Sequence, residues 1–398
     1  MKILLINVVY NKGSTGVIVN NLYDYYSVLG HEVSVAYGRG QLIKEKDIYK
    51  VGNEFEANVH HFFSKITGNM YGGMLFSTNK LIKIIQKIEP DIVHIHCING
   101  YFTNIYRLIK FIKINKLKVV LTNHSDFMFT ANCGYSLWCD NWKNKECRGC
   151  PRVKEFNGPF SLNRTHSFYI KMKKAFEGMT GIHVTGVSPW LTDRVKQSPI
   201  FSSFPISTVL NGVSLELTNI RNEENPYTSV NPLNKKIVLY VTANFDEVEK
   251  GGSYISEIAK LCPEEIFVVI GSTEKKIIEN IIFVGRVKSS DLAKYYYYAD
   301  ASLLLSKRET FSMVVAESLI CGTPVVGFLS GGPEAIAIKE YSSFVENGDV
   351  SSLVASLNKV LMTQNDKHYI MKMADEKYSV KASAEEYLNI YQRISNEK

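Results

Sequence analysis

Short apolar runs alternate with longer amphipathic stretches along most of this chain. The runs at 2–7, 91–96 and 118–122 are rich in apolar residues and are typical of buried strands in a parallel sheet. Between them, 77–88 and 104–114 repeat apolar residues at helical spacing. The alternation predicts an α/β domain built on a doubly wound parallel sheet, in which ligands bind at the carboxyl ends of the strands.

A second series of strands and helices follows a polar segment. Strand patterns lie at 237–241, 266–270, 281–284, 301–305 and 323–326, and the clearest helical pattern among them is at 289–298. The polar segment contains Asn-Pro twice, which is typical of a linker. We therefore predict a first domain at 1–212, a linker at 213–235, a second domain at 236–380 and a final helix at 381–398.

The composition is that of a folded chain without an export signal or a membrane-spanning segment. No apolar run reaches about 18 residues, and the start of the chain lacks the pattern of a signal peptide. We therefore expect a cytoplasmic location. The seven cysteines are an odd number, and in a reducing compartment they do not predict a disulfide framework.

Positive charge is concentrated in the first half of the chain. Residues 1–200 hold 26 Lys and Arg against 14 Asp and Glu, whereas the remaining residues hold 20 against 25. This asymmetry favours an anionic partner such as a membrane surface or a phosphorylated lipid, with ordinary solvated helix faces as the alternative. Nucleic acid is not expected, because the charge is spread over helices and no known reading motif occurs.

The predicted helix at 167–176 places Lys171, Lys173 and Lys174 beside aromatic and aliphatic residues. A basic amphipathic stretch of this kind can dock on an anionic bilayer, as a peripheral contact with the inner membrane surface. The alternative, which we favour, is a helix that packs on its sheet and leaves its lysines in water.

Four of the cysteines, Cys133, Cys139, Cys147 and Cys150, fall within 18 residues in a segment (123–160) with little periodicity. In a reducing compartment such a cluster predicts structural zinc held by four thiolates, which would staple an irregular loop. Thiols without a metal are the alternative, and an iron–sulfur cluster is a more distant one.

Two strand exits of the first domain carry candidate binding residues. Gly13, Ser14, Thr15 and Gly16 lie between the first strand and a helical pattern, a layout that places an anion or a sugar at a helix N-terminus. A tight turn with a Ser or Thr cap is the alternative. His124 follows the strand at 118–122, where it could polarise a substrate or serve as a structural residue.

Two carboxylates mark a strand exit of the second domain. Glu309 and Glu317 are eight residues apart, at the end of a strand and within the following helical run, with Thr310, Phe311 and Ser312 after the first acid. Carboxylates suit sugar hydroxyls, and amides at a helix start suit phosphate. Two unrelated acids on a surface turn are the alternative.

Other strand exits of the second domain combine glycine with a charged residue. They are Lys250-Gly251, Gly285-Arg286 and Gly331-Gly332, the last followed closely by Glu334. A lysine beside glycines at a helix start can reach a diphosphate. Together with the two carboxylates, these residues describe one rim that holds a sugar nucleotide.

The sequence of this rim resembles that of glycosyltransferase family 4, a family of retaining enzymes with the GT-B fold. The resemblance covers nearly the whole chain and is strongest from 237 to 350, where the run 306–317 and Cys321–Val326 are among the residues that carry it. The segment 122–151 resembles the capsule and exopolysaccharide branch of the colanic-acid type. The resemblance implies two Rossmann-like domains that face an interdomain cleft, with the last helix crossing back to the first domain.

The resemblance also implies roles for individual residues. Glu309 contacts the hexose hydroxyls, Glu317 the ribose hydroxyls and Lys250 the departing diphosphate, while His124 lies at the reacting centre. The expected catalytic residues are therefore His124, Glu309 and Lys250. The expected donor-binding residues are Gly13, Ser14, Thr15, Gly16, Asn244, Gly285, Arg286, Thr310, Phe311, Ser312 and Glu317.

Two positions depart from the family pattern. Ala243-Asn244 stands where the family usually has Gly-Arg, so one of two expected phosphate-binding cations is missing. Ser125 follows His124 where this branch often has an acid, and Asp126 comes one place later.

The function implied is a hexosyltransferase that moves a sugar from a nucleotide-diphosphate donor to a lipid-linked or polysaccharide acceptor in surface polysaccharide biosynthesis. The family needs no metal for catalysis, so any zinc would be structural. One alternative is a non-catalytic GT-B subunit that scaffolds a partner through the Cys-rich loop. The other is a nucleotide-sugar epimerase, for which we find no convincing acid–base groups.

Overall fold

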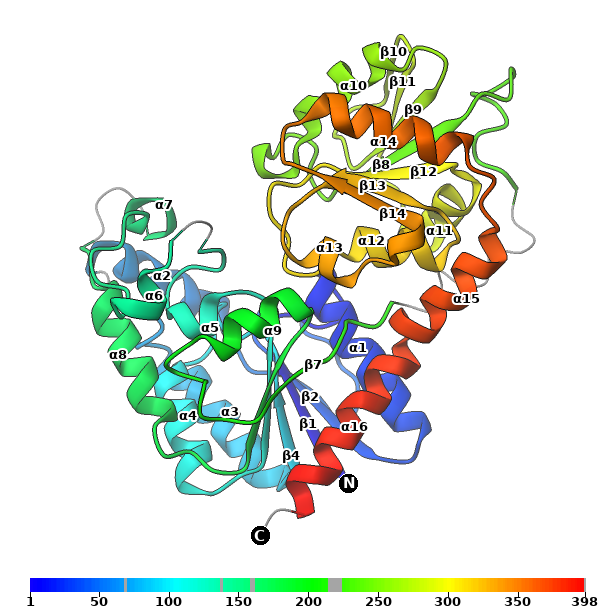
Figure 1. The fold of residues 1–398 in the computed structure, drawn as a ribbon. Helices are drawn as coiled ribbons and strands as arrows, with labels where there is room; N and C mark the ends of the chain where they lie inside the picture. Colours follow the sequence, from blue (N-terminus) through cyan, green and yellow to red (C-terminus); the bar gives the residue numbers. More distant parts are fainter. Residues whose placement is uncertain (68–69, 137–138, 158–161, 214–223, 397–398) are drawn as a thin grey trace. The chain divides into compact units, whose positions relative to one another are not determined.

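The computed structural model describes residues 1–67, 70–136, 139–157, 162–213 and 224–396 (Figure 1). The chain forms two compact units, Met1–Val209 with Ala384–Lys398 and Leu210–Ser383. No helix in the described ranges is long and apolar enough to cross a membrane.

The first unit is built on a seven-stranded sheet in the order β3-β2-β1-β4-β5-β6-β7. Every neighbouring pair is parallel, with Leu4 of β1 opposite Ser34 of β2 and Val93 of β4. The strands are β1 (Lys2–Asn7), β2 (Glu32–Tyr37), β3 (Ile48–Lys50), β4 (Ile92–Ile95), β5 (Val119–Asn123), β6 (Ile182–Gly186) and β7 (Ile206–Thr208). Most strand residues are buried because helices cover the sheet.

The helices predicted at 77–88, 104–114 and 167–176 are confirmed, with shifts of one or two residues at their starts. Asn104 caps α4 by accepting a hydrogen bond from the Arg107 amide at 3.0 Å, so the helix begins one residue later than predicted. The longer helices are α1 (Gly13–Val28), α2 (Glu54–Thr67), α3 (Leu75–Ile88), α4 (Ile105–Ile114), α8 (Thr165–Phe176) and α9 (Pro189–Lys196). Short helices are α5 (Phe127–Thr130), α6 (Asn141–Asn144) and α7 (Val153–Asn157).

The last helix, α16 (Val380–Asn396), packs on the first sheet through two buried tyrosines. Tyr391 Oη lies 2.6 Å from Nδ1 of His94, and Tyr387 Oη lies 3.0 Å from Thr122 Oγ1. Tyr26 of α1 also donates to the Ala384 carbonyl at 3.1 Å. These contacts join the end of the chain to β4, β5 and α1, which is why it belongs to the first unit.

The second unit has a seven-stranded sheet in the order β10-β11-β9-β8-β12-β13-β14. The strands are β8 (Ile237–Val241), β9 (Ile266–Ile270), β10 (Lys276–Ile278), β11 (Ile281–Gly285), β12 (Ala301–Leu304), β13 (Val325–Phe328) and β14 (Ser342–Val345). Its main helices are α10 (Ile255–Leu261), α11 (Ser289–Tyr298), α12 (Met313–Ile320), α14 (Val350–Met362) and α15 (Lys367–Tyr378). The fold class predicted from the sequence is therefore confirmed.

Several elements differ from the prediction. The segment 40–75, which has no clear periodicity, contains β3 and α2. The edge strand β10 pairs antiparallel with β11, so the second sheet is not wholly parallel. Tyr227, within the predicted linker, is 2% exposed and donates to the Tyr295 carbonyl at 2.6 Å. Burial of this single aromatic residue attaches part of a polar segment to the second unit.

We expect Tyr391→Phe to lower the free energy of unfolding of the first unit by about 1–3 kcal/mol, because it leaves a buried imidazole nitrogen of His94 without its partner. Trp138, Trp142 and Trp190 all precede residue 210, so tryptophan fluorescence during urea unfolding reports on this unit. Tyr25→Phe, which removes an exposed 3.4 Å contact with Glu385, is the matched control. Equal losses in both variants would contradict the prediction.

Candidate functional site

A pocket of about 340 Å³ opens at the carboxyl edge of the second sheet. The ends of β8, β9 and β11 and the side of α12 form its walls, and Glu317 and Arg286 are its charged residues. Its lining is Val241, Thr242, Ala243, Ile270, Gly271, Arg286, Val287, Leu292, Val314 and Glu317. The chain passes from β11 on one side of β8 to β12 on the other, so this edge is where the strand order reverses.

Close backbone approach shapes the floor of this pocket. Gly271 has φ of +103°, and a Cβ at this position would lie 1.7 Å from the Thr242 carbonyl oxygen. Only glycine permits both this dihedral angle and this approach. The ends of β8 and β9 therefore meet closely below the charged residues.

Glu317 is the most perturbed carboxyl group of the pocket. Burial raises its pKa to about 7, and a hydrogen bond from Tyr296 Oη at 3.2 Å partly opposes this shift. Because this carboxyl group is partly removed from water, a hydrogen bond to a ligand has a larger effect here than at an exposed carboxylate. Strongly perturbed groups of this kind are candidate functional residues.

Lys250 and Glu309 form an ion pair at the same sheet edge. Lys250 Nζ lies 2.8 Å from Glu309 Oε1, and both side chains are partly buried. Lys250 ends a short 3₁₀ helix, η2 (Val248–Lys250), and Tyr240 of β8 donates to its carbonyl at 2.7 Å. The structure thus brings together two of the three predicted catalytic residues.

Thr310, Phe311 and Ser312 connect Glu309 to α12 and are all buried. Ser312 has φ of +76° and caps α12 by accepting from the Val315 amide at 3.4 Å. The helix predicted after Glu309 therefore begins at Met313, beyond the carboxylate. A Cβ on Gly332 would lie 2.2 Å from the Thr310 carbonyl, so the Gly331-Gly332 turn packs directly on this connection.

The remaining predicted residues of this unit have less contact with the pocket. Gly285 ends β11 with φ of +86°, which directs the chain to the exposed Arg286. Asn244 is exposed, lies just beyond the pocket lining, and its amide donates to Thr242 Oγ1 at 3.3 Å. Asn244 therefore supports the turn after β8, in the region where the family usually supplies an arginine.

In the first unit, the predicted glycine loop opens α1 at the end of β1. Gly13 and Ser14 are exposed, and no side chain caps the helix start, so its first amides are available to a ligand. Asn7 fixes the loop, because its Nδ2 donates to the Val9 carbonyl at 2.7 Å and to Thr15 Oγ1 at 3.3 Å. Gly16 packs against Val9.

His124 belongs to a cluster of three histidines at the carboxyl ends of β4 and β5. His96 Nδ1 lies 3.0 Å from His124 Nε2, and the rings of His94 and His96 are 4.0 Å apart. Burial lowers the pKa of His94 and His96 well below the usual value and that of His124 to about 4. All three imidazoles are neutral at pH 7, so His124 is suited to hydrogen bonding rather than to carrying charge.

Sequence reasoning missed the support around His124. His94 and His96 follow each other with one residue between them on an apolar strand, a spacing that places both on one face of the sheet. Their tyrosine partners on α16 are almost 300 residues away in the chain. The His-x-His spacing could have been noticed, but the partners depend on the packing of the last helix.

The four clustered cysteines do not form the predicted zinc site. All four lie in the described ranges, yet no group of three His, Cys, Asp or Glu side chains there could hold a metal ion. Burial raises the pKa of Cys133 to about 12 and keeps Cys147 protonated, with its Sγ 3.4 Å from the Thr130 carbonyl. The Cys147 thiol is therefore buried, and the Cys133 thiol partly buried, as neutral groups.

A buried ion pair holds this segment instead. Asp126 is fully buried and accepts from Arg194 of α9 at 2.9 Å, from the Ser136 amide at 2.7 Å and from Ser136 Oγ at 2.8 Å. Arg194 also lies over the ring of Trp142, which is 1% exposed. A buried carboxylate with several hydrogen-bond donors thus holds the segment in place of the metal that the cysteine spacing predicts.

Two family models match the chain, and together they span most of it. Residues 15–217 match Glycosyltransferase Family 4, and residues 222–377 match Glycosyl transferases group 1.

Similar proteins of known name cover the same ranges. WcaC of Escherichia coli, a glycosyl transferase provisionally assigned to colanic acid biosynthesis, is 21% identical over 79% of this chain and 80% of its own length. The N-acetyl-α-D-glucosaminyl L-malate synthase of Bacillus anthracis is 21% identical over 96% of this chain and 93% of its own. The structure of Anabaena HepE with UDP covers 99% and 100% of the two chains at 12% identity with a TM-score of 0.65, a likeness of fold.

We predict that Glu317→Gln stabilises α12 at pH 8. A carboxyl group whose folded-state pKa is raised makes folding less favourable as the pH rises above its unfolded value, and glutamine cannot ionise. The gain should be about 1–3 kcal/mol at pH 8 and should shrink towards pH 5. Hydrogen exchange of the Met313–Ile320 amides measures it, and Glu264→Gln, whose side chain is 85% exposed, is the control. A gain that is the same at both pH values would contradict this account.

The histidine cluster predicts acid sensitivity of the first unit. Because burial lowers these pKa values, the unfolded chain binds protons that the folded unit does not, so stability falls as the pH drops below about 6.5. Each neutral histidine should contribute about 1.4 kcal/mol per pH unit. Urea unfolding followed by tryptophan fluorescence at several pH values measures this dependence. In His96→Gln the free energy of unfolding should fall less steeply with decreasing pH than in the unchanged protein. The slope should not change in His368→Gln, which replaces an exposed imidazole.

Proposed function

Because this chain belongs to glycosyltransferase family 4, we propose that it is a retaining glycosyltransferase that moves a hexose from a nucleoside diphosphate to a lipid-linked or polysaccharide acceptor. The observation that carries this proposal is the partly buried carboxyl group of Glu317 in a pocket at the carboxyl edge of the second sheet. A carboxylate there accepts from two neighbouring hydroxyls, as a ribose presents them.

The pocket is assigned to the nucleoside of the donor. Its volume of about 340 Å³ suits a base and a ribose, and Arg286 lies at its exposed rim. Ionisation of Glu317 near pH 7 implies that the carboxylate form, which binds hydroxyl donors best, predominates only above that pH. Donor affinity is therefore expected to rise between pH 6 and pH 8.

The Lys250–Glu309 ion pair is assigned to the diphosphate and the hexose. Lys250 supplies positive charge where the leaving diphosphate becomes more negative, and Glu309 accepts from hexose hydroxyls. The pair keeps both side chains ordered, so little further conformational freedom is lost when the donor contacts them. Lys250 is the chief candidate cation here, because Asn244 stands where the family usually has arginine.

In the proposed reaction the bond between the anomeric carbon and the diphosphate oxygen breaks. The acceptor hydroxyl oxygen bonds to the same face of that carbon, and its proton passes to the departing phosphate. His124, neutral and supported by His96, is assigned to a hydrogen bond with the reacting sugar. The exposed amides at the start of α1, with Ser14, are assigned to the diphosphate.

A role in surface polysaccharide synthesis follows from similarity rather than from the pocket. WcaC, which is similar over most of both chains, is provisionally assigned to colanic acid biosynthesis. The Cys-rich segment, held by Asp126 and Arg194, is assigned to acceptor recognition because it begins immediately after His124.

A donor panel tests the proposal. Thermal-shift measurements with UDP, GDP, ADP and dTDP sugars should reveal at least one donor that raises the melting temperature. With that donor, Glu309→Gln and Lys250→Met should each lower kcat/KM for transfer or for slow donor hydrolysis by about 10²–10³-fold. Lys359→Met, an exposed substitution on α14, is the control. The proposal fails if no donor binds, or if both site variants keep full activity.

A further inference from the structure

Helix α2 has an unusual distribution of apolar side chains. Its inner face packs on the unit through fully buried Ala57 and Ser64, and its outer face carries a row of large apolar residues. That row, at helical spacing, is Phe55, Val59, Phe62 and Phe63, exposed by 78%, 40%, 62% and 55%. An exposed apolar row of this size is uncommon on a surface that meets only water.

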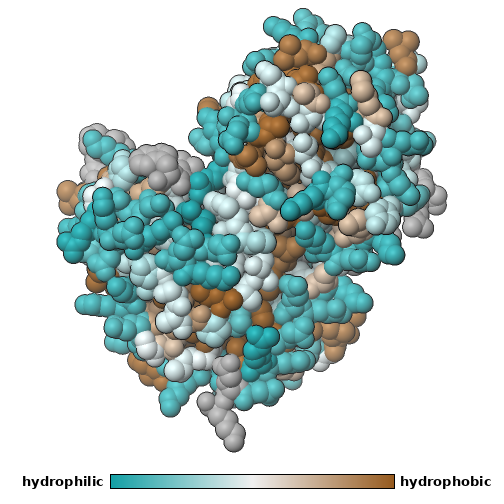
Figure 2. All heavy atoms as spheres, in the orientation of Figure 1, coloured by the Kyte–Doolittle hydropathy of each residue, from teal (hydrophilic) through white to brown (hydrophobic). Residues whose placement is uncertain are grey.

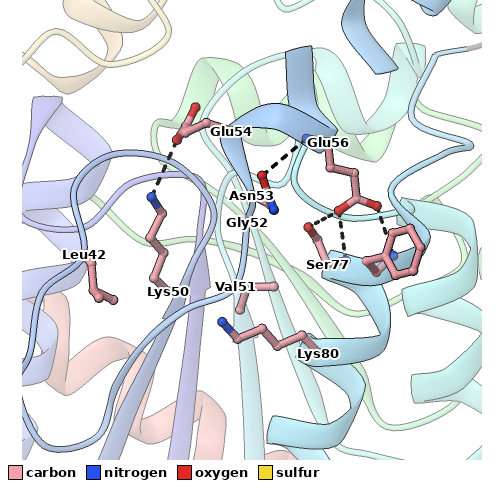
Figure 3. Close-up of a pocket in the computed structure, with 10 residues that line it drawn as sticks. Leu42, Lys50, Val51, Gly52, Asn53, Glu54, Glu56, Ser77 and Lys80 are labelled. Atoms are coloured by element: carbon pink, nitrogen blue, oxygen red, sulfur yellow. Dashed lines mark hydrogen bonds and ion pairs between the residues drawn. The ribbon is translucent and has the colours of Figure 1, made fainter. Parts of the chain in front are cut away.

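The row continues onto the start of α3. Leu75 and Phe76 are exposed by 54% and 82%. Glu56 of α2 joins the two helices, because its carboxylate accepts from the Phe76 amide at 3.0 Å and from the Ser77 amide at 3.1 Å (Figure 3). A pocket of about 470 Å³ adjoins this junction, and Lys80 of α3 lines it together with Lys50 and Glu54 (Figure 3).

The carboxylates of α2 are already engaged. Glu54 pairs with Arg39 at 2.8 Å, and Glu56 caps the start of α3. Neither acid therefore opposes contact of the exposed aromatic row with a negatively charged partner.

A strongly basic groove lies between α4 and α8. It has a volume of about 660 Å³ and is lined by five cationic side chains and no carboxylate: Arg107, Lys110, Lys113, Lys171 and Lys174. Tyr106 and Ile114 supply apolar wall, and Lys171 Nζ lies 6.0 Å from the Tyr106 ring centre. Figure 2 shows hydrophilic and hydrophobic residues interleaved on the face of the first unit that this view presents. Its charge and apolar walls suit amphiphilic anions rather than simple salts.

The groove and the aromatic row are connected through the α2–α3 loop. Gly72, which follows the end of α2 by five residues, lines the groove, and Asn104 Nδ2 donates to its carbonyl at 2.7 Å. The apolar residues of α8 itself, such as Phe168 and Met172, are buried. Of the lysines of α8, Lys171 and Lys174 line the groove and Lys173 pairs with Glu146 at 3.1 Å, whereas the exposed apolar side chains belong to α2.

We propose that the aromatic row of α2, with Leu75 and Phe76, and the basic groove between α4 and α8 form one surface that binds a lipid bilayer containing anionic headgroups. The aromatic side chains enter the interface between headgroups and acyl chains, and the lysines bind the phosphates. The inference rests on the proposed function only in that a lipid-linked acceptor is presented at a bilayer.

Co-sedimentation with vesicles tests this surface without any donor or acceptor. The full chain should bind vesicles in which about one third of the lipid is phosphatidylglycerol, bind neutral phosphatidylcholine vesicles weakly, and lose binding in high salt. Lys171→Glu with Lys174→Glu should lower the partition coefficient by about 25-fold or more. Phe62→Ser with Phe63→Ser should lower it by about tenfold.

Matched controls come from the second unit. Lys339→Glu with Lys359→Glu changes the net charge equally, and Leu261→Ser with Met362→Ser removes two exposed apolar side chains. Both should bind anionic vesicles within about twofold of the unchanged protein. Circular dichroism confirms that each variant is folded.

Distinct outcomes overturn the proposal. Equal binding of neutral and anionic vesicles, or equal loss in the control variants, excludes this surface. Loss confined to the lysine variant, together with tight binding of inorganic polyphosphate, makes the groove a site for soluble anions. Donor hydrolysis in the absence of lipid is a separate readout, so failure of vesicle binding leaves the proposed function standing.

Discussion

Parallel strand pairing is the constraint on which the candidate site depends. In a parallel sheet all carboxyl ends lie at one edge, so the loops that follow the strands gather there irrespective of their separation in the chain. The pocket that we assign to the nucleoside uses residues from the ends of β8, β9 and β11, and the ion pair joins the segment after β12 to the loop after β8. The same constraint in the first unit brings Asn7, His96 and His124 to one edge.

Burial sets the protonation states of the titratable groups at these two sheet edges. Glu317 is kept in a site that disfavours its charged form, and the three histidines are kept neutral by the same desolvation. Both groups lower the free energy of unfolding over part of the pH range. The unfolded chain releases the proton of Glu317 more readily than the folded unit does, and it binds protons at the histidines more readily. A folded protein commonly retains such groups where a ligand, rather than the fold, benefits from them.

In the Cys-rich segment and in α2, packing decides the role of residues whose sequence pattern allows more than one interpretation. Four clustered cysteines suggest a metal, yet the segment is held by the Asp126–Arg194 pair and by burial of Trp142. Conversely, the lysine-bearing helix suggests a membrane contact, yet its own apolar face is buried and the exposed aromatic face belongs to α2. In both cases composition identified the region, and packing determined which side chains carry the interaction.

The sequence by itself determined the two doubly wound α/β units, most of their strands and helices, and the placement of Lys250 and Glu309 at one rim, whereas their ion pair is seen only in the structure. These follow from local periodicity and from the rule for parallel strands, which need no knowledge of distant contacts. Tertiary structure alone decided the raised pKa of Glu317, the partners of His94 on α16, the attachment of Tyr227 to the second unit and the absence of a metal cluster from the described Cys-rich residues. The physical reason is that desolvation and hydrogen bonding depend on neighbours far away in the chain, whereas periodicity depends only on neighbours along it.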